Sequence, residues 1–360
     1  MRFKLILPFL FCFFTSQILA QEKYSNDFLN IGVGASEMSQ GGAVVARTNT
    51  EAAGYWNPAG LLNSKNPWSM SAMHAETFAG IAQYDYVGGQ YKVSDSLVVG
   101  ASFVRFGIDN ILNTTNLIDT QGNFDYSRIT KFSVADYAFL LHAASPLFID
   151  NLKVGATAKI IYRQIGNLAN AYGFGFDLGA QYQYKKWQLG AVAKDVTGTF
   201  NAWSYSLDDT TKAGLLLSGN ELPSNALEVT LPSFVFGIAR NFSVYRGLSI
   251  SAEANLILTT DGKRNTVVRT NFGSLDPLIG FEADYNKRVF LRMGVNNMQR
   301  VTEGVEINEF TFQPNLGLGL RIGHWFLDYA LTNISSTSGT MYGNLFTVSY
   351  RMPHIGSGEF

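Results

Sequence analysis

The chain has 360 residues, of which 46% are hydrophobic, 14% are aromatic and only 15% are charged, whereas an average soluble domain has about 25% charged residues. Its 27 Lys and Arg nearly balance its 28 Asp and Glu, so no basic excess can neutralise a phosphate backbone and we expect no nucleic-acid partner. The 17 Tyr and 27 Phe are typical of a folded chain and exclude extensive disorder.

Both ends of the chain differ from the rest. Residues 1–20 are expected to form a signal peptide, because Arg2 and Lys4 precede a short apolar run that ends at Ala20, a small residue at the expected cleavage point. The single cysteine, Cys12, lies in this segment, so we expect no disulfide and no cysteine metal site in the mature protein. Residues 353–360 contain a Gly-Ser-Gly step that resembles an engineered linker.

Apolar and polar residues alternate through most of the chain after Trp68. Between 172 and 184 the even positions hold Tyr, Phe, Leu or Ala, and the odd positions hold Gly, Asp or Gln. This period of two predicts strands with two different faces, and the segments suit the roughly nine to eleven tilted residues that cross a bilayer. The predicted strands are 68–76, 81–92, 96–107, 134–146, 151–163, 171–184, 187–195, 232–243, 247–258, 275–285, 288–296, 313–322, 325–333 and 343–352.

The lengths of the links between these strands depend on strand parity. Links that follow even strands are short, whereas the long ones follow odd strands and comprise 108–133, 196–231, 259–274 and 297–312. An up-and-down barrel separates loops in this way, with long loops outside the cell and short turns in the periplasm. We therefore predict an all-β membrane protein, a 14-stranded antiparallel transmembrane β-barrel over 68–352 in the outer membrane, with both termini periplasmic. A secreted β-sandwich or propeller is the alternative.

The segment before the barrel, residues 21–67, is rich in glycine and does not alternate. A barrel of fourteen strands is wide enough to hold water or a plug, and we predict that this segment is the plug, or hatch. For Asn57 and Pro58, local turn chemistry is the alternative to a gating role. The motifs of the segment are Gly41, Gly42, Ala43 and the run Trp56, Asn57, Pro58, Ala59, Gly60.

These motifs, between a signal peptide and a barrel, resemble the PorV/PorQ family of outer-membrane proteins, relatives of the FadL-type hydrophobic transporters. The resemblance implies a fourteen-stranded barrel with an N-terminal hatch. It also implies a link to the type IX secretion system, with translocon components or secreted cargo proteins as partners beside the outer-membrane lipid.

Residue patterns of enzymes and metal sites are scarce. The chain has four histidines and lacks a His-Glu-x-x-His or Gly-x-Ser-x-Gly motif, so we expect no enzyme activity, no metal site and no cofactor. Asp136 and His142 could form an acid/base pair, but two solvated residues of a wet interior are the alternative. The polar residues expected to face the lumen, where they could contact the hatch or solutes, are Asp136, His142, Lys159, Arg163, Asp177, Glu253 and Arg321.

Two functions remain open at this stage. The first is an accessory role in type IX secretion, in which the barrel binds or anchors exported proteins at the cell surface. The second is passive transport of hydrophobic small molecules through the lumen. The first would use apolar residues of the long link 196–231 as a partner surface, namely Trp203, Tyr205, Leu215, Leu216 and Leu217.

Overall fold

A computed structural model describes residues 25–77, 80–114, 117, 122–217, 219–303, 307–334 and 342–353. The predicted signal peptide lies outside the described residues, as does the C-terminal tail after Pro353. No described helix is long or apolar enough to pass through a membrane.

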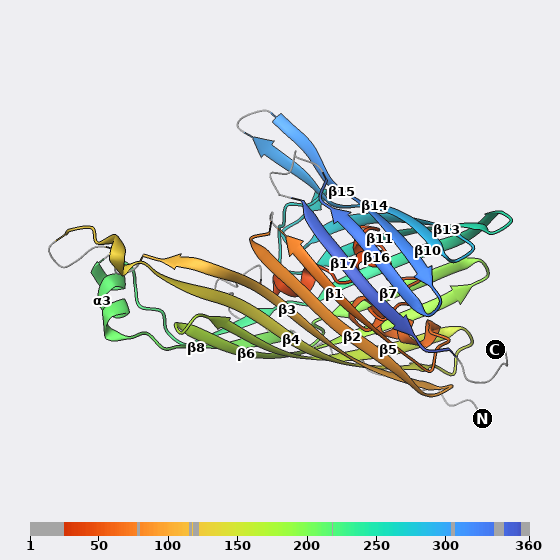
Figure 1. Cartoon of the computed structure of the whole chain (residues 1–360), viewed down its shortest axis with the longest axis horizontal. Helices are drawn as coiled ribbons and strands as arrows, with labels where there is room; N and C mark the ends of the chain where they lie inside the picture. Colours follow the sequence, from red (N-terminus) through yellow and green to blue (C-terminus); the bar gives the residue numbers. More distant parts are fainter. Residues whose placement is uncertain are drawn as a thin grey trace, which may run out of the picture.

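Fourteen strands of the described chain form a closed antiparallel barrel, as Figure 1 shows. The ring closes where β1 pairs with β17, with Ala72 opposite Val348. This confirms the predicted fold, and every predicted strand has its counterpart. The ring strands are β1 (Trp68–Thr77), β2 (Ala82–Ser94), β3 (Leu97–Asn113), β4 (Thr130–Pro146), β5 (Leu152–Ile165), β6 (Ala169–Tyr184), β7 (Trp187–Lys194), β10 (Ser233–Tyr245), β11 (Leu248–Thr259), β13 (Ser274–Tyr285), β14 (Val289–Glu303), β15 (Ile307–Ile322), β16 (Trp325–Thr332) and β17 (Gly343–Arg351).

Three further strands and two helices lie in the links that were predicted to be loops. These strands are β8 (Thr199–Tyr205), β9 (Ala226–Thr230) and β12 (Val268–Arg269), and the helices are η3 (Tyr126–Arg128) and α3 (Asp209–Leu217). β8 pairs with β6 next to the end of β7, and β9 pairs with β8. Together with the ends of β3 and β4 they form the long extension at the left of Figure 1. The alternation fades in this extension, where half-buried and exposed residues predominate on β9 and at the end of β3.

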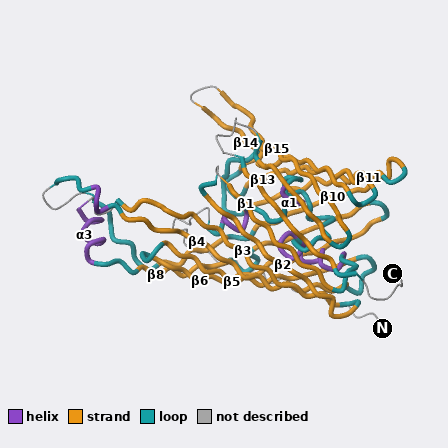
Figure 2. Tube along the Cα trace, in the orientation of Figure 1, coloured by secondary structure: helices purple, strands orange, loops and turns teal. Residues whose placement is uncertain are grey.

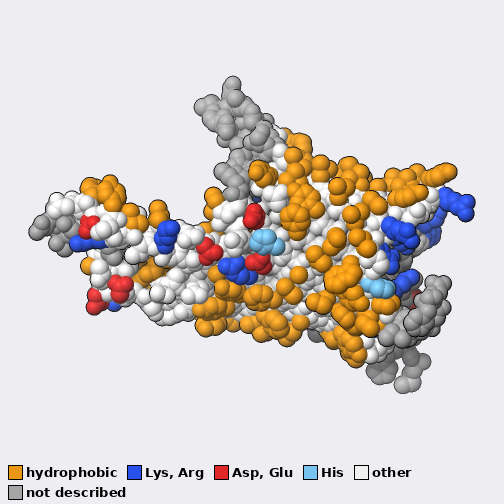
Figure 3. All heavy atoms as spheres, viewed as in Figure 1, with side chains coloured by type: hydrophobic (Ala, Val, Ile, Leu, Met, Phe, Trp, Pro, Cys, Tyr) orange, Lys and Arg blue, Asp and Glu red, His pale blue; other side chains and the backbone are white. Residues whose placement is uncertain are grey.

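The outer face of the barrel is apolar and the inner face is polar. Along β6, Leu178 is 51% exposed while its neighbour Asp177 is 8% exposed. Figure 3 shows apolar side chains covering the wall over β1, β2, β16 and β17, whereas the extension carries fewer of them. In lipid an apolar face needs no partner, so the exposure of these side chains fits a membrane-spanning wall.

The N-terminal segment is defined as residues 25–67. It contains η1 (Asp27–Asn30), α1 (Ala35–Met38), α2 (Ala53–Trp56) and η2 (Pro58–Asn63), and Figure 2 shows these short helices within the ring of strands. Side chains of the segment bond to the inner wall: the Asn57 amide donates to the Ala180 carbonyl over 3.0 Å, and Arg351 contacts Glu51 at 2.7 Å. That the segment closes the lumen stays a prediction.

Wall glycines let the N-terminal segment approach the backbone of the strands. A Cβ atom on Gly155 would lie 2.5 Å from Pro58, and one on Gly190 would lie 2.5 Å from the Val45 oxygen. A real side chain at either position would have to push the segment away. Glycine is therefore required here by close approach of two backbones rather than by a turn.

The apolar outer face predicts the effect of a charge placed on it. Leu178→Arg, near the middle of β6, is expected to lower the free energy of unfolding by about 2–4 kcal/mol, since Arg at the bilayer midplane costs that much. Leu178→Ala is the control, because it shortens the side chain without adding a charge. Reversible urea unfolding in lipid vesicles measures both, and equal stability of the two variants would contradict a lipid-facing position.

Packing of the segment on the wall predicts a second outcome. Gly155→Leu should force η2 from β5 at a cost of roughly 1–3 kcal/mol, so that protease cleaves the N-terminal segment about tenfold faster in the folded barrel. Ala156→Leu is the matched control, since Ala156 is the exposed neighbour of Gly155 and faces outward. Limited proteolysis of the purified variants tests this, and identical cleavage rates would show that the segment does not rest on Gly155.

Candidate functional site

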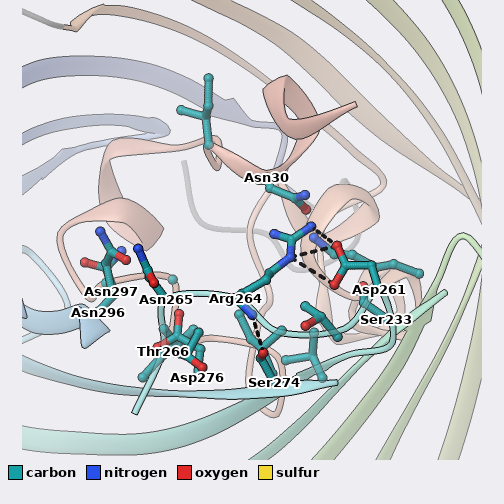
Figure 4. A pocket seen from close by; sticks show the side chains of 18 of the residues that line it. Asn30, Ser233, Asp261, Arg264, Asn265, Thr266, Ser274, Asp276, Asn296 and Asn297 are labelled. Atoms are coloured by element: carbon teal, nitrogen blue, oxygen red, sulfur yellow. Dashed lines mark hydrogen bonds and ion pairs between the residues drawn. The ribbon is translucent and has the colours of Figure 1, made fainter. Parts of the chain in front are cut away.

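A cavity of about 1120 Å³ lies between the N-terminal segment and the wall. Most of its wall residues belong to β10, β11, β13, β14 and the link between β11 and β13, and others, such as Asn315 of β15 and Lys194 of β7, belong to further strands. Figure 4 shows polar side chains of this lining, with the pair Asp261 and Arg264 joined by hydrogen bonds. Its volume is sufficient for a small organic molecule.

The floor of the cavity is apolar. Trp56 and Met38 reach it from the segment, and Val235 and Leu278 reach it from the wall; each is at most 9% exposed. The Trp56 indole donates a 2.9 Å hydrogen bond to the Val33 carbonyl, which orients its ring. A floor of this kind favours aromatic or aliphatic ligands.

The upper lining is rich in amides and hydroxyls. Asn315 donates to the Asn296 side-chain oxygen over 3.0 Å, and Gln299 donates to that of Asn297 over 2.5 Å. Thr266 donates to the Val268 carbonyl over 2.9 Å. These groups are held by hydrogen bonds and give the lining a polar part beside the apolar floor.

Ion pairs hold the N-terminal segment near this cavity. The Arg47 guanidinium lies 3.3 Å from Glu253 of β11 and 3.5 Å from Glu282 of β13. The Ala46 amide also donates to Glu253 over 2.7 Å. Losing Arg47 would leave the buried Glu253 without an ionic partner among the described residues, whereas Glu282 would keep Arg292 at 2.6 Å.

The structure places most of the predicted lumen residues inside the barrel, in separate groups. Asp136 pairs with Arg163 at 2.8 Å, and Lys159 pairs with Asp177 at 2.6 Å. Glu253 belongs to the Arg47 group described above. None of the seven predicted residues lines the described cavity.

Three members of the predicted set are placed differently from one of the expectations. His142 forms hydrogen bonds with the hydroxyls of Ser102 and Thr157 at 2.9 and 2.8 Å, while the carboxylate of Asp136 forms an ion pair with Arg163. Their side chains therefore form no acid/base pair. Arg321 has the parity of an inward residue but lies at the end of β15, where it is exposed and donates to the Gly323 carbonyl.

The predicted hatch motifs supply part of the cavity. Gly41, Gly42 and Trp56 line it. Asn57 shows the local turn chemistry that was the alternative, since its oxygen accepts from the Ala59 amide over 3.1 Å, and it also bonds to the wall. Pro58 and Ala59 pack against the wall at Gly155, whereas Gly60 lies against Thr48 within the segment.

The predicted partner surface is divided by the fold. Trp203 and Tyr205 lie on β8 rather than in a loop, and the Trp203 indole donates to Glu228 over 2.6 Å. Leu215, Leu216 and Leu217 lie on α3, where Leu216 is 58% and Leu217 is 77% exposed.

Hydrogen bonds from the backbone and hydroxyl of Thr211 lower the pKa of Asp208, which precedes α3.

Several lining residues were not singled out from the sequence. Asp276 is the second residue of the predicted strand 275–285, and Asn297 and Thr266 lie in links predicted to be loops. The adjacent residues Asn296 and Asn297, at the end of the predicted strand 288–296, were the feature of the sequence that could have indicated this part of the lining. Among the described residues, no three His, Cys, Asp or Glu side chains are grouped so that they could hold a metal ion.

Comparison with solved structures supports the fold. No protein-family model and no curated protein matches the sequence. The chain is similar to the toluene transporter TbuX of Ralstonia pickettii, with 16% identity, a TM-score of 0.56 and coverage of 89% of this chain and 99% of that one. It is also similar to the monoaromatic hydrocarbon channel CymD, with 13% identity, a TM-score of 0.55 and coverage of 91% and 99%. The toluene transporter TodX of Pseudomonas putida has 11% identity, a TM-score of 0.54 and coverage of 88% and 96%. At these identities the similarity shows a common barrel fold over nearly the whole chain.

Proposed function

We propose that this protein is an outer-membrane channel through which small hydrophobic molecules cross passively. The observation that carries the proposal is the cavity between the N-terminal segment and the wall, with its buried apolar floor. A solute that leaves water for this floor gains the free energy of burying apolar surface, about 25 cal/mol per Å². The names of the three similar barrels, which are transporters or channels for toluene and monoaromatic hydrocarbons, agree with this function.

In this proposal the N-terminal segment acts as a hatch. Its ion pairs to Glu253, Glu282 and Arg351 hold it across the lumen. The cavity lies where the segment and the wall are separated. Passage then requires a local movement of the segment rather than opening of the barrel, since the strand pairing of the barrel has no free edge at β1 and β17.

A pair of neighbouring residues on β11 tests the proposal. Ile257 lines the cavity and Leu256 faces outward with 38% exposure. Ile257→Trp should fill part of the cavity and slow the uptake of radiolabelled toluene several-fold in cells whose outer membrane carries the protein. Leu256→Trp adds the same side chain on the other face and should leave uptake unchanged.

The comparison is valid only if both variants are folded and present at equal levels in the outer membrane. Gel mobility with and without heating can establish this. If Ile257→Trp transports toluene as fast as the wild type, the cavity is not on the route. If cells that carry the wild type take up toluene no faster than cells without the protein, passive transport of small hydrophobic molecules is not its function.

Binding of exported proteins, as the PorV/PorQ resemblance implies, is a second proposal, and the exposure of Leu216 and Leu217 on α3 favours it. Replacing both leucines by serine should then remove the partners recovered from gently solubilised membranes. Recovery of neither translocon components nor secreted cargo by the wild type would count against a role in type IX secretion.

A further inference from the structure

One carboxyl group of the cavity has no ionic partner among the described residues. Three aspartates line the cavity. Asp195 is paired with Lys159 and Asp261 with Arg264, so their charges are compensated. Asp276 of β13 has no such cation, and Figure 4 shows it among the side chains of the lining.

The hydrogen bonding of Asp276 is also incomplete. The backbone amide of Met298 lies close to the carboxyl group, but the Oδ1 atom of Asp276 is buried and has no donor in the described part of the chain. A carboxyl group can accept about four hydrogen bonds, and a buried acceptor without a donor is unfavourable. Rotation about the last side-chain torsion, which is soft in aspartate, can turn either oxygen toward the cavity.

An apolar surface lies close enough to this carboxyl group for one small molecule to contact both. Leu278 is two residues further along the same face of β13, a spacing of about 7 Å, and Ile257 is the cross-strand partner of Asp276. A Cβ atom on Gly42 would lie 2.9 Å from the Trp56 ring and 4.0 Å from Leu278, so this ring borders the same surface. An aromatic ring placed there would have its substituent near Asp276.

The charges of the lining distinguish a hydroxyl from an ammonium group as the donor. Lys194 lines the same cavity, and no described carboxylate forms an ion pair with it, so its positive charge disfavours a cationic ligand. A neutral hydroxyl supplies one donor without adding charge.

We propose that Asp276 makes the cavity selective for small aromatic molecules that carry a hydroxyl group, with the ring on Trp56 and Leu278 and the hydroxyl donating to the carboxyl. This selectivity rests on the proposed function, because it requires that the cavity admits small hydrophobic molecules. The expected solutes are phenols and aromatic alcohols, which differ from aromatic hydrocarbons in one hydrogen-bond donor, the hydroxyl group.

Three bromoarenes of similar shape test the proposal. Bromine quenches indole fluorescence on contact, so the signal that is lost in Trp56→Phe reports ligand at the cavity floor. The probes are 4-bromophenol, 4-bromoanisole, which replaces the hydroxyl by a methoxy group, and 4-bromotoluene. Titrations of the full chain in lipid nanodiscs are corrected for partition into empty nanodiscs. The wild type should bind 4-bromophenol about tenfold more tightly than 4-bromoanisole, the effect of one hydrogen bond to a charged group.

Variants assign this preference to the carboxyl group. Asp276→Leu should reduce the preference for 4-bromophenol to less than about twofold and keep the affinity for 4-bromotoluene, which also shows that the variant is folded. Asp276→Asn, which retains a neutral acceptor, should give an intermediate value. Asp284→Leu is the matched control, because it removes a carboxyl group at the other end of β13, outside the lining of the cavity, and it should keep the full preference.

The outcomes separate the selectivity from the transport proposal. If the wild type binds all three probes equally, or if Asp276→Leu keeps the preference, the role of Asp276 is wrong while the hydrophobic channel stands. If 4-bromophenol binds and 4-bromotoluene does not, the selectivity stands and a hydrocarbon channel is wrong. If no probe quenches Trp56, both proposals fall.

Discussion

The structure depends on one constraint, which is that every backbone amide and carbonyl in lipid needs a hydrogen-bond partner within the protein. Each unpaired group costs several kcal/mol in hydrocarbon. Pairing of β17 with β1 removes the two edges that an open sheet would leave, and strand alternation then sorts side chains between lipid and lumen. The polar interior is a consequence of this sorting: Asp177 and Lys159 can neutralise each other inside at 2.6 Å, and neither could face lipid.

A closed ring of fourteen strands creates a second requirement, because its lumen is too wide for the wall side chains to fill. The N-terminal segment occupies part of that space. Its backbone comes close to the wall at Gly155, Gly190 and Gly294, where a Cβ atom would lie within 2.5 Å of the segment. The same wall thus alternates bulky apolar residues outside with glycines or polar residues inside, and the glycines determine how closely the segment can pack.

The sequence predicts the ring well and the site poorly, for physical reasons. A period of two is a local property, so the fourteen strands could be located from neighbours alone, and their inward residues followed from parity. Ion pairs such as Asp136 with Arg163 depend on register between strands, which parity does not provide. β9 was missed because its residues no longer alternate between two faces, and β8 was missed because its clear alternation covers only four residues, 199–202. Thr266 was missed because it lies in the link between β11 and β12, and Asn297 was missed because the pairing of β14 shifts register after Asn296, where the alternation breaks.

The position of the cavity follows from how the segment is held. Near the short turns it contacts β11, β13 and β14 closely, through Glu253, Gly280 and Gly294. Ile257 and Asp276 lie further along the same strands, toward the long links, and border the cavity instead. The segment therefore provides a floor and leaves the space above it unfilled. A solute in this space contacts amides and hydroxyls of the lining as well as its apolar groups, and the carboxyl of Asp276 lies on the same face of β13 as Leu278.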